Sequence, residues 1–190
     1  MTTSLFSART LATLMLSSAL AACGGSSHDA GISGTISGLT TGPLILYNGF
    51  NSINLGEGST GFAFGTRLPL GTVYNVSITS VPSTLSCAVN NASGVATGDV
   101  NNVQVVCVPN NNLGGTVTGL RTSGLALTNG SDTVSVPANA TSFVFSRRVG
   151  QGYPYGVTIL TQPTGQTCSL ANAVGTMGVA DINSVQVTCS

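Results

Sequence analysis

The chain has 190 residues, of which 42% are hydrophobic and only 5% are charged, and its formal net charge at pH 7 is zero. Intrinsically disordered chains combine low hydrophobicity with high net charge, so this composition excludes disorder as the general state of the chain. With so few Arg and no Lys, the chain lacks the basic surface that neutralises phosphates, which argues against nucleic acid as a partner.

Residues 1–22 have the features of a signal peptide. Arg9 supplies a short positive region, and residues 11–20 form an apolar run that is too short for a membrane span of about 20 residues. The next residues, Leu-Ala-Ala-Cys-Gly ending at Gly24, resemble the lipobox of bacterial lipoproteins. The resemblance implies that Cys23 becomes the acylated amino terminus and anchors the protein in a membrane. Gly24, where Asp would retain the protein at the inner membrane, implies the outer membrane.

An ordinary cleaved signal peptide followed by a chance cysteine is the alternative interpretation of this segment. In the lipoprotein interpretation, residues 23–32 comprise the lipid anchor and a polar, glycine-rich tether. The tether contains His28, the only histidine of the chain, which we expect to be solvated rather than a ligand.

The rest of the chain consists of two similar halves. An offset of 81 aligns residues 34–39 with 115–120 and residues 44–49 with 125–130, and after one inserted residue Cys107 aligns with Cys189. The alignment predicts a first repeat over 33–108, a linker over 109–113 and a second repeat over 114–190.

Within each repeat, apolar residues recur with period two, which is typical of half-buried strands. Asn48-Gly49 and Asn129-Gly130 are strong signals for two-residue hairpins, because both residues tolerate positive φ. We expect seven strands in each repeat, arranged antiparallel in a two-sheet sandwich. The expected ranges are 34–38, 43–48, 51–56, 61–66, 73–81, 84–89 and 102–108, then 115–119, 124–129, 132–137, 142–147, 154–162, 165–170 and 183–189.

The five cysteines of an exported chain leave one unpaired. If Cys23 carries lipid, the repeat pairs the other four as two disulfides, Cys87–Cys107 and Cys168–Cys189. A metal site is excluded because these four cysteines are divided between the repeats, without CxxC spacing and without His. Closing a loop of this size stabilises a fold by about 3 kcal/mol.

The pattern of Gly, Phe, Tyr and β-branched residues over 61–78 resembles immunoglobulin-like and prealbumin-like modules of bacterial envelope proteins. The resemblance implies an all-β protein of two tandem seven-stranded antiparallel β-sandwiches with one disulfide each. It specifies an architecture and a location in the cell envelope, and it does not specify an activity.

The repeats lack the residues that common catalytic sites use. They contain neither His nor Lys, which excludes Ser–His, Ser–Lys and Schiff-base arrangements. Asp99 and Asp181 precede the last strand of each repeat, where Asp commonly accepts backbone hydrogen bonds. Glu57 and Asp132 belong to different repeats and cannot form a pair unless the repeats fold together. We therefore expect no enzyme activity, no cofactor and no metal site.

Differences between the repeats suggest where a ligand would bind. Tyr47 and Phe50 flank the first hairpin where the second repeat has Thr and Ser, and Arg147 and Tyr153 replace two Thr of the first repeat. Exposed aromatic side chains beside polar groups are typical of sugar-binding surfaces. Alternatively, Tyr47 and Phe50 pack against the neighbouring repeat. The sequence thus favours a lipid-anchored structural or adhesive protein, with an envelope glycan or surface protein as partner and a carbohydrate-binding lipoprotein as the alternative.

Overall fold

The computed structural model describes residues 29–49 and 51–190, and these residues form β-strands, turns and loops without any helix. The all-β prediction is therefore confirmed for this part of the chain. No apolar helix long enough to span a membrane occurs among these residues. The predicted sites at Cys23 and Phe50, and the tether residue His28, lie outside the described residues.

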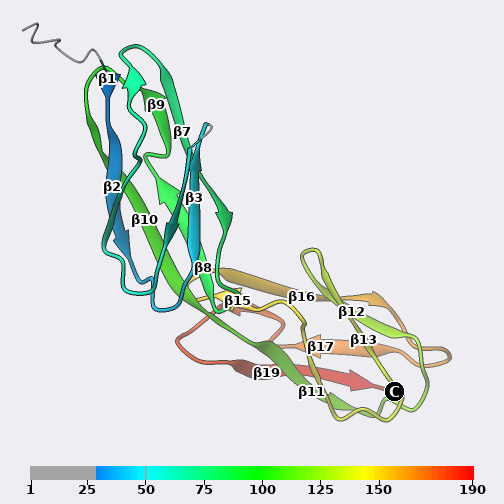
Figure 1. Cartoon of the computed structure of the whole chain (residues 1–190). Helices are drawn as coiled ribbons and strands as arrows, with labels where there is room; N and C mark the ends of the chain where they lie inside the picture. Colours follow the sequence, from blue (N-terminus) through cyan, green and yellow to red (C-terminus); the bar gives the residue numbers. More distant parts are fainter. Residues whose placement is uncertain (1–28, 50) are drawn as a thin grey trace, which may run out of the picture.

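A first unit contains two sheets of four strands and a short ribbon. One sheet has the order β5-β2-β10-β8, the other has the order β4-β3-β7-β9, and β1 pairs with β6 (Figure 1). The strands are β1 (Asp29–Ala30), β2 (Ile32–Ser37), β3 (Leu44–Asn48), β4 (Asn51–Leu55), β5 (Gly61–Ala63), β6 (Leu68–Pro69), β7 (Val73–Ser80), β8 (Leu85–Asn90), β9 (Ser93–Val95) and β10 (Val100–Asn111).

A second unit has the corresponding arrangement, with sheets β14-β11-β19-β17 and β13-β12-β16-β18. Here the short strand β15 pairs with the end of β10. The strands are β11 (Leu113–Thr118), β12 (Leu125–Asn129), β13 (Asp132–Val136), β14 (Ser142–Val144), β15 (Val149–Gly150), β16 (Pro154–Thr161), β17 (Cys168–Ala171), β18 (Val174–Thr176) and β19 (Ile182–Cys189).

Each unit has its own hydrophobic core between its two sheets. The alternation read from the sequence explains this arrangement, since Leu44 and Leu46 of β3 are fully buried while Tyr47 is exposed. In the first core the rings of Phe62 and Phe64 meet edge to face with centroids 5.8 Å apart, and Phe143 and Phe145 do so at the same distance in the second.

The prediction of purely antiparallel sheets is wrong. In each unit the first long strand lies parallel to the last one, β2 beside β10 and β11 beside β19. The short strands β1, β6, β9, β15 and β18 were also not predicted. Period-two alternation reports which side chains of a strand are buried, but it carries no information about the direction of the neighbouring strand.

Both predicted disulfides are present, Cys87–Cys107 and Cys168–Cys189. Each joins residues that lie directly opposite each other on neighbouring antiparallel strands, β8 with β10 and β17 with β19. The disulfide of antibody domains links the two sheets across the core. Here each disulfide instead reinforces the edge of a single sheet beside the parallel strand pair.

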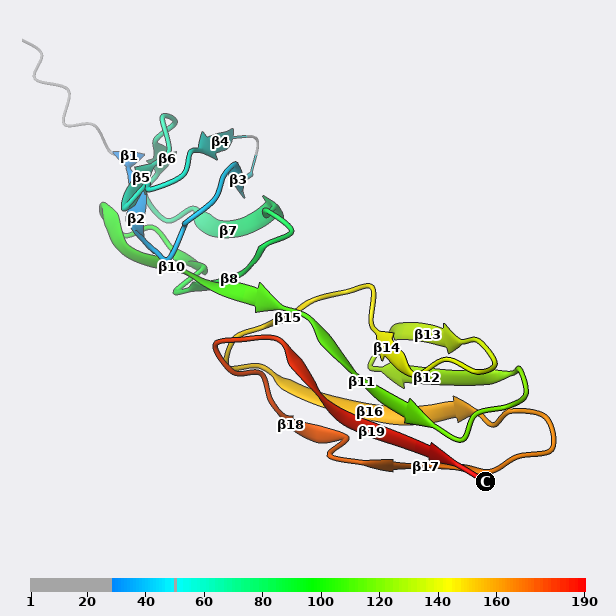
Figure 2. The same ribbon diagram turned by 90° about the horizontal axis from the view of Figure 1, so that it is seen from below.

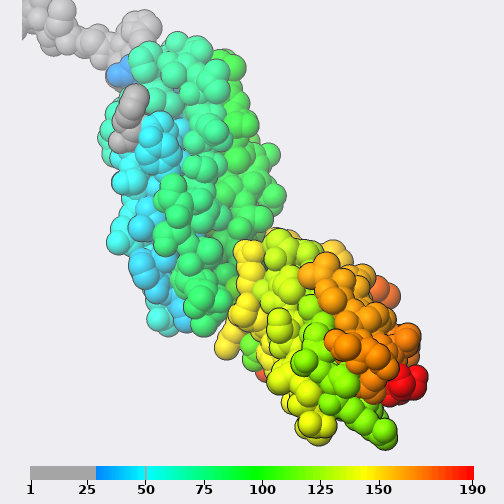
Figure 3. All heavy atoms as spheres, turned by 90° about the vertical axis from the view of Figure 1, so that its right-hand side faces the viewer, coloured from blue at the N-terminus to red at the C-terminus, as the bar shows by residue number. Residues whose placement is uncertain are grey.

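The stretch 109–113, expected to be a linker, is almost entirely strand. β10 continues through Asn111 and pairs with β15, and β11 begins at Leu113. Figure 2 shows β10 running from the first unit toward β15 and β11 of the second, and Figure 3 shows two lobes joined end to end. One strand thus belongs to both units.

Candidate functional site

The described residues offer little conventional site chemistry. They contain no group of three or more His, Cys, Asp or Glu side chains placed to hold a metal ion. Several polar interactions recur in both units, among them the backbone N–H groups that donate to Asn48 and Asn129. Those where the chain enters each unit involve charged side chains, and these define the candidate site.

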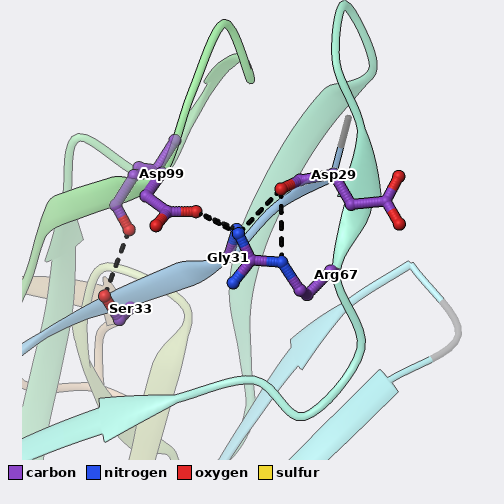
Figure 4. Close-up of polar contacts among 6 residues, drawn as sticks. Asp29, Gly31, Ser33, Arg67 and Asp99 are labelled. Atoms are coloured by element: carbon purple, nitrogen blue, oxygen red, sulfur yellow. Dashed lines mark hydrogen bonds and ion pairs between the residues drawn. The ribbon is translucent and has the colours of Figure 1, made fainter. Parts of the chain in front are cut away.

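Asp99 holds the strand that enters the first unit (Figure 4). Its Oδ1 accepts a hydrogen bond from the backbone N–H of Gly31 at 2.7 Å and from Nη2 of Arg67 at 2.6 Å. The same Arg67 donates through Nε and Nη2 to the carbonyl oxygen of Asp29, at 3.2 and 2.7 Å. Ser33 Oγ adds a hydrogen bond to the carbonyl oxygen of Val100. Three segments of the first unit therefore meet at one charged side-chain pair.

Asp181 makes the corresponding contacts at the start of the second unit. Its Oδ1 accepts from the backbone N–H of Asn112 at 2.7 Å, and its Oδ2 accepts from Nδ2 of the same residue at 2.9 Å. The asparagine side chain thus supplies the second donor that Arg67 provides in the first unit. We call the Asp99–Arg67–Gly31 group and the Asp181–Asn112 group the two clamps.

The clamps shift the acidity of both carboxyl groups. The hydrogen bond from Gly31, followed by the positive charge of Arg67, lowers the pKa of Asp99 from its ordinary value of 3.8. The backbone and then the side chain of Asn112 lower the pKa of Asp181 in the same way. Both shifts favour the ionised carboxylate, because each hydrogen bond is donated to it.

The second clamp lies at a junction built by the end of β10. Asn110 and Asn111 pair with Gly150 and Val149, and the backbone N–H of Gln151 donates to the carbonyl oxygen of Pro109 at 2.8 Å. On the side of the first unit, Asn110 is held by Ser86 Oγ at 2.7 Å. A Cβ on Gly150 would lie 2.9 Å from Cβ of Ser86, so the two units are in close contact.

The structure separates the residues of the predicted ligand face. Tyr47 lies on the outer side of β3, opposite Ser52 and Ser77, and is 38% exposed. Arg147 lies beside the second hairpin, where its Nη1 donates to Ser131 Oγ at 3.2 Å. Tyr153 is also exposed, and it follows β15 at the junction.

A hollow adjoins each hairpin, and the residues that line the two hollows differ. Beside Asn48 and Gly49 a hollow of about 410 Å³ is lined in part by Leu68 and Val73. The corresponding hollow in the second unit, about 290 Å³, is lined by Asp132, the two arginines 147 and 148, and their neighbours. In the second hollow, the Asp132 carboxylate accepts hydrogen bonds from Ser146 Oγ and from the backbone N–H of Arg147.

Sequence reasoning placed Asp99 and Asp181 in turns but did not identify Arg67 or Asn112 as their partners. The sequence did offer a signal for Arg67. Arg148 occupies the equivalent position of the second repeat, and the chain has only five arginines. No sequence signal pointed to Asn112, because it lies in a run of three asparagines.

No family model and no curated protein matches this chain. Solved structures that it resembles include the Bacillus anthracis TIE protein, at 12% identity and a TM-score of 0.31, with 84% of this chain and 34% of that chain covered. A mutant of the shaft pilin spaA from Lactobacillus rhamnosus GG is 11% identical with a TM-score of 0.32, and 85% of this chain and 98% of that chain are covered. The major pilin protein of Streptococcus pyogenes is 10% identical with a TM-score of 0.21, and 85% of this chain and 95% of that chain are covered. The chain spans about a third of the TIE protein, and TM-scores this low carry no argument about function.

Proposed function

We propose that this protein is a non-enzymatic, lipid-anchored protein of the bacterial cell envelope with a structural or adhesive role. In this proposal Cys23 holds it in the outer membrane, and two tandem immunoglobulin-like or prealbumin-like repeats carry a polar β-surface away from the lipid. The observation that supports it best is the strand β10, which belongs to both units and joins them without a flexible linker.

The strand order suits a protein that is held at one end and loaded at the other. In each unit the first and last long strands are parallel neighbours, and the chain enters and leaves at opposite ends. A pull along the molecule therefore shears the hydrogen bonds between β2 and β10 together rather than opening them one at a time. This arrangement favours a spacer or adhesive stalk over a freely hinged pair of domains.

The anchor is tested by replacing Cys23 in the full-length chain. Cys23→Ala should release the mature protein from the membrane fraction into the soluble envelope fraction, because acyl chains supply the membrane affinity. Ser26→Ala, three residues further on, is the matched control and should stay in the membrane fraction. Membrane partitioning of Cys23→Ala equal to that of the wild type would contradict the lipid anchor.

A carbohydrate-binding lipoprotein is the second candidate, and the exposed Tyr47 between two serines favours it. If this surface binds sugar, Tyr47→Ala should lose saturable binding on a panel of envelope glycans while its melting temperature stays unchanged. A lowered melting temperature would instead assign Tyr47 to packing. Tyr153→Ala, tested on the same glycan panel, shows whether the junction contributes to sugar binding.

A further inference from the structure

The end of the first unit from which the tether emerges carries an exposed apolar surface. Val73 of β7 and Val95 of β9 lie directly opposite each other and are 68% and 54% exposed, and Leu70 is 46% exposed. Leu70 is adjacent to them, because the N–H of Gly71 donates to the carbonyl oxygen of Ala96 at 2.9 Å. We call Leu70, Val73 and Val95 the apolar end patch.

The patch lies at the end of the unit where the chain enters. β1 pairs with β6, so Asp29 lies opposite Pro69, the residue immediately before Leu70. Figure 1 shows β1 and β9 together at the end of the molecule that points away from the second unit. The patch therefore lies on the outer face of the sheet at the end of the unit where the described chain begins.

The corresponding end of the second unit carries different residues. Its corresponding end is joined to the first unit through β15 and the hydrogen bond from Gln151 to Pro109. Gln151 corresponds to Leu70, and the opposed pair Pro154 and Thr176 corresponds to Val73 and Val95. Pro154 and Thr176 are exposed as well, and this surface is less apolar than its counterpart, so the apolar character belongs to the unit that adjoins the amino-terminal segment.

The length of the tether limits what that can be. Six residue steps separate Cys23 from Asp29, and a fully extended chain covers at most about 3.6 Å per residue, so Asp29 lies within roughly 20 Å of the anchored cysteine. Apolar side chains enter the lipid interface to a depth of about 5–10 Å. At the same end of the unit Arg67 is paired with Asp99, and the exposed Asp29 leaves the described residues there with a small net negative charge, so the contact rests on the apolar side chains and not on charge.

From these observations we propose that Leu70, Val73 and Val95 dock on the surface of the lipid bilayer and fix the orientation of the first unit on the membrane. The proposal rests on the lipid anchor described under the proposed function. The anchor supplies a high local concentration of membrane, so a patch too small to bind vesicles alone is sufficient to orient an anchored protein.

Tryptophan placed in the patch tests this contact, since the chain contains no Trp of its own. The full-length lipidated variants Leu70→Trp and Leu160→Trp are reconstituted into vesicles of phosphatidylethanolamine and phosphatidylglycerol, with and without brominated acyl chains. Leu160 is 60% exposed on β16 near the far end of the second unit, opposite the region of Ala126, and is the matched control.

We expect brominated lipid to quench Leu70→Trp emission by about twofold and to shift its maximum to shorter wavelength, because the side chain enters the interface. Leu160→Trp should remain unquenched. A Leu70→Trp variant that floats with the vesicles but is not quenched would overturn the docking and leave the anchor intact.

Two other outcomes also decide the matter. A blue shift of Leu70→Trp that depends on protein concentration and not on brominated lipid would assign the patch to a second copy of the chain and overturn the proposal. Failure of the wild-type protein to float with vesicles would refute the lipid anchor itself, and the membrane-facing role of the patch with it.

Discussion

At the level of single residues, the two units use the same carboxylate for the same purpose. Asp99 and Asp181 each precede the last strand and accept the backbone N–H of the residue before the first long strand, both at 2.7 Å. The two ends of each unit's chain are thereby fixed to each other. Only the second donor differs, a guanidinium in one unit and an asparagine amide in the other.

These clamps make stability depend on pH in a defined direction. Both carboxyl groups have a pKa below 3.8 in the folded protein, so their contribution is present above that pH and is lost as the pH falls through the lowered value. Asp181→Ala should lower the melting temperature at pH 7, and its difference from the wild type should shrink as the pH approaches 3.

Thermal unfolding followed by circular dichroism over this pH range provides the measurement. Asp99→Ala should lower the melting temperature with the same pH dependence, because it removes the clamp of the first unit. Glu57→Ala, which removes an exposed carboxyl from a turn, is the control and should melt as the wild type does. A melting-temperature difference for Asp181→Ala that stays constant down to pH 2 would refute the clamp.

At the level of elements, each disulfide closes a hairpin-like segment at the edge of one sheet. The bridged cysteines are 20 and 21 residues apart and lie on directly paired strands. A cross-link in this position restricts the unfolded chain, and it also prevents β8 and β17 from separating from the strands that form the parallel pairs. Oxidising compartments, such as the bacterial periplasm, maintain such bonds.

Removing one disulfide should destabilise the unit that contains it. The double substitution of Cys168 and Cys189 by Ser is expected to lower the free energy of unfolding of the second unit by about 3 kcal/mol, because the unfolded chain regains the entropy of an open loop. Urea unfolding of this variant, compared with the corresponding variant of the first unit, measures the effect. Non-reduced peptide mapping of the wild type that pairs Cys87 with Cys168 or Cys189 would contradict the connectivity.

At the level of the whole molecule, the shared strand β10 determines how the units are joined. The close approach at Gly150 leaves no room for a side chain, since an added Cβ would lie within 3.0 Å of Ser86 and of Tyr153. Packing at this point, together with strand pairing, fixes the relative placement of the two units more firmly than a five-residue linker would.

A side chain at Gly150 should therefore loosen the junction without unfolding either unit. For Gly150→Val we expect a broader distribution of distances between spin labels placed on the two units, measured by pulsed electron paramagnetic resonance. Gly178→Val lies in open space near the same junction and should leave the distribution unchanged. An equally narrow distribution for Gly150→Val would show that strand pairing alone fixes the units.

Much of this organisation follows from the sequence because it depends on local patterns. Alternation placed Leu44 and Leu46 inside and Tyr47 outside, and the internal similarity of the two halves paired the four cysteines correctly. The Asn-Gly pairs predicted where both hairpins lie but not their turns, because Asn48 pairs with Asn51 and Asn129 with Asp132, so that the turn begins at the glycine, which alone of each pair has positive φ. Each of these inferences concerns residues that are near in sequence or related by the repeat.

Only the tertiary structure decided the direction of strand pairing and the nature of the junction. Whether β2 lies parallel or antiparallel to β10 depends on how many times the chain crosses between sheets, which side-chain alternation does not record. The partnership of Arg67 with Asp99 and the continuation of β10 to Asn111 depend on contacts between segments far apart in sequence. A hydrophobic pattern determines which face of a strand is buried, whereas the folded chain determines which strand lies beside it and which residues meet at its ends.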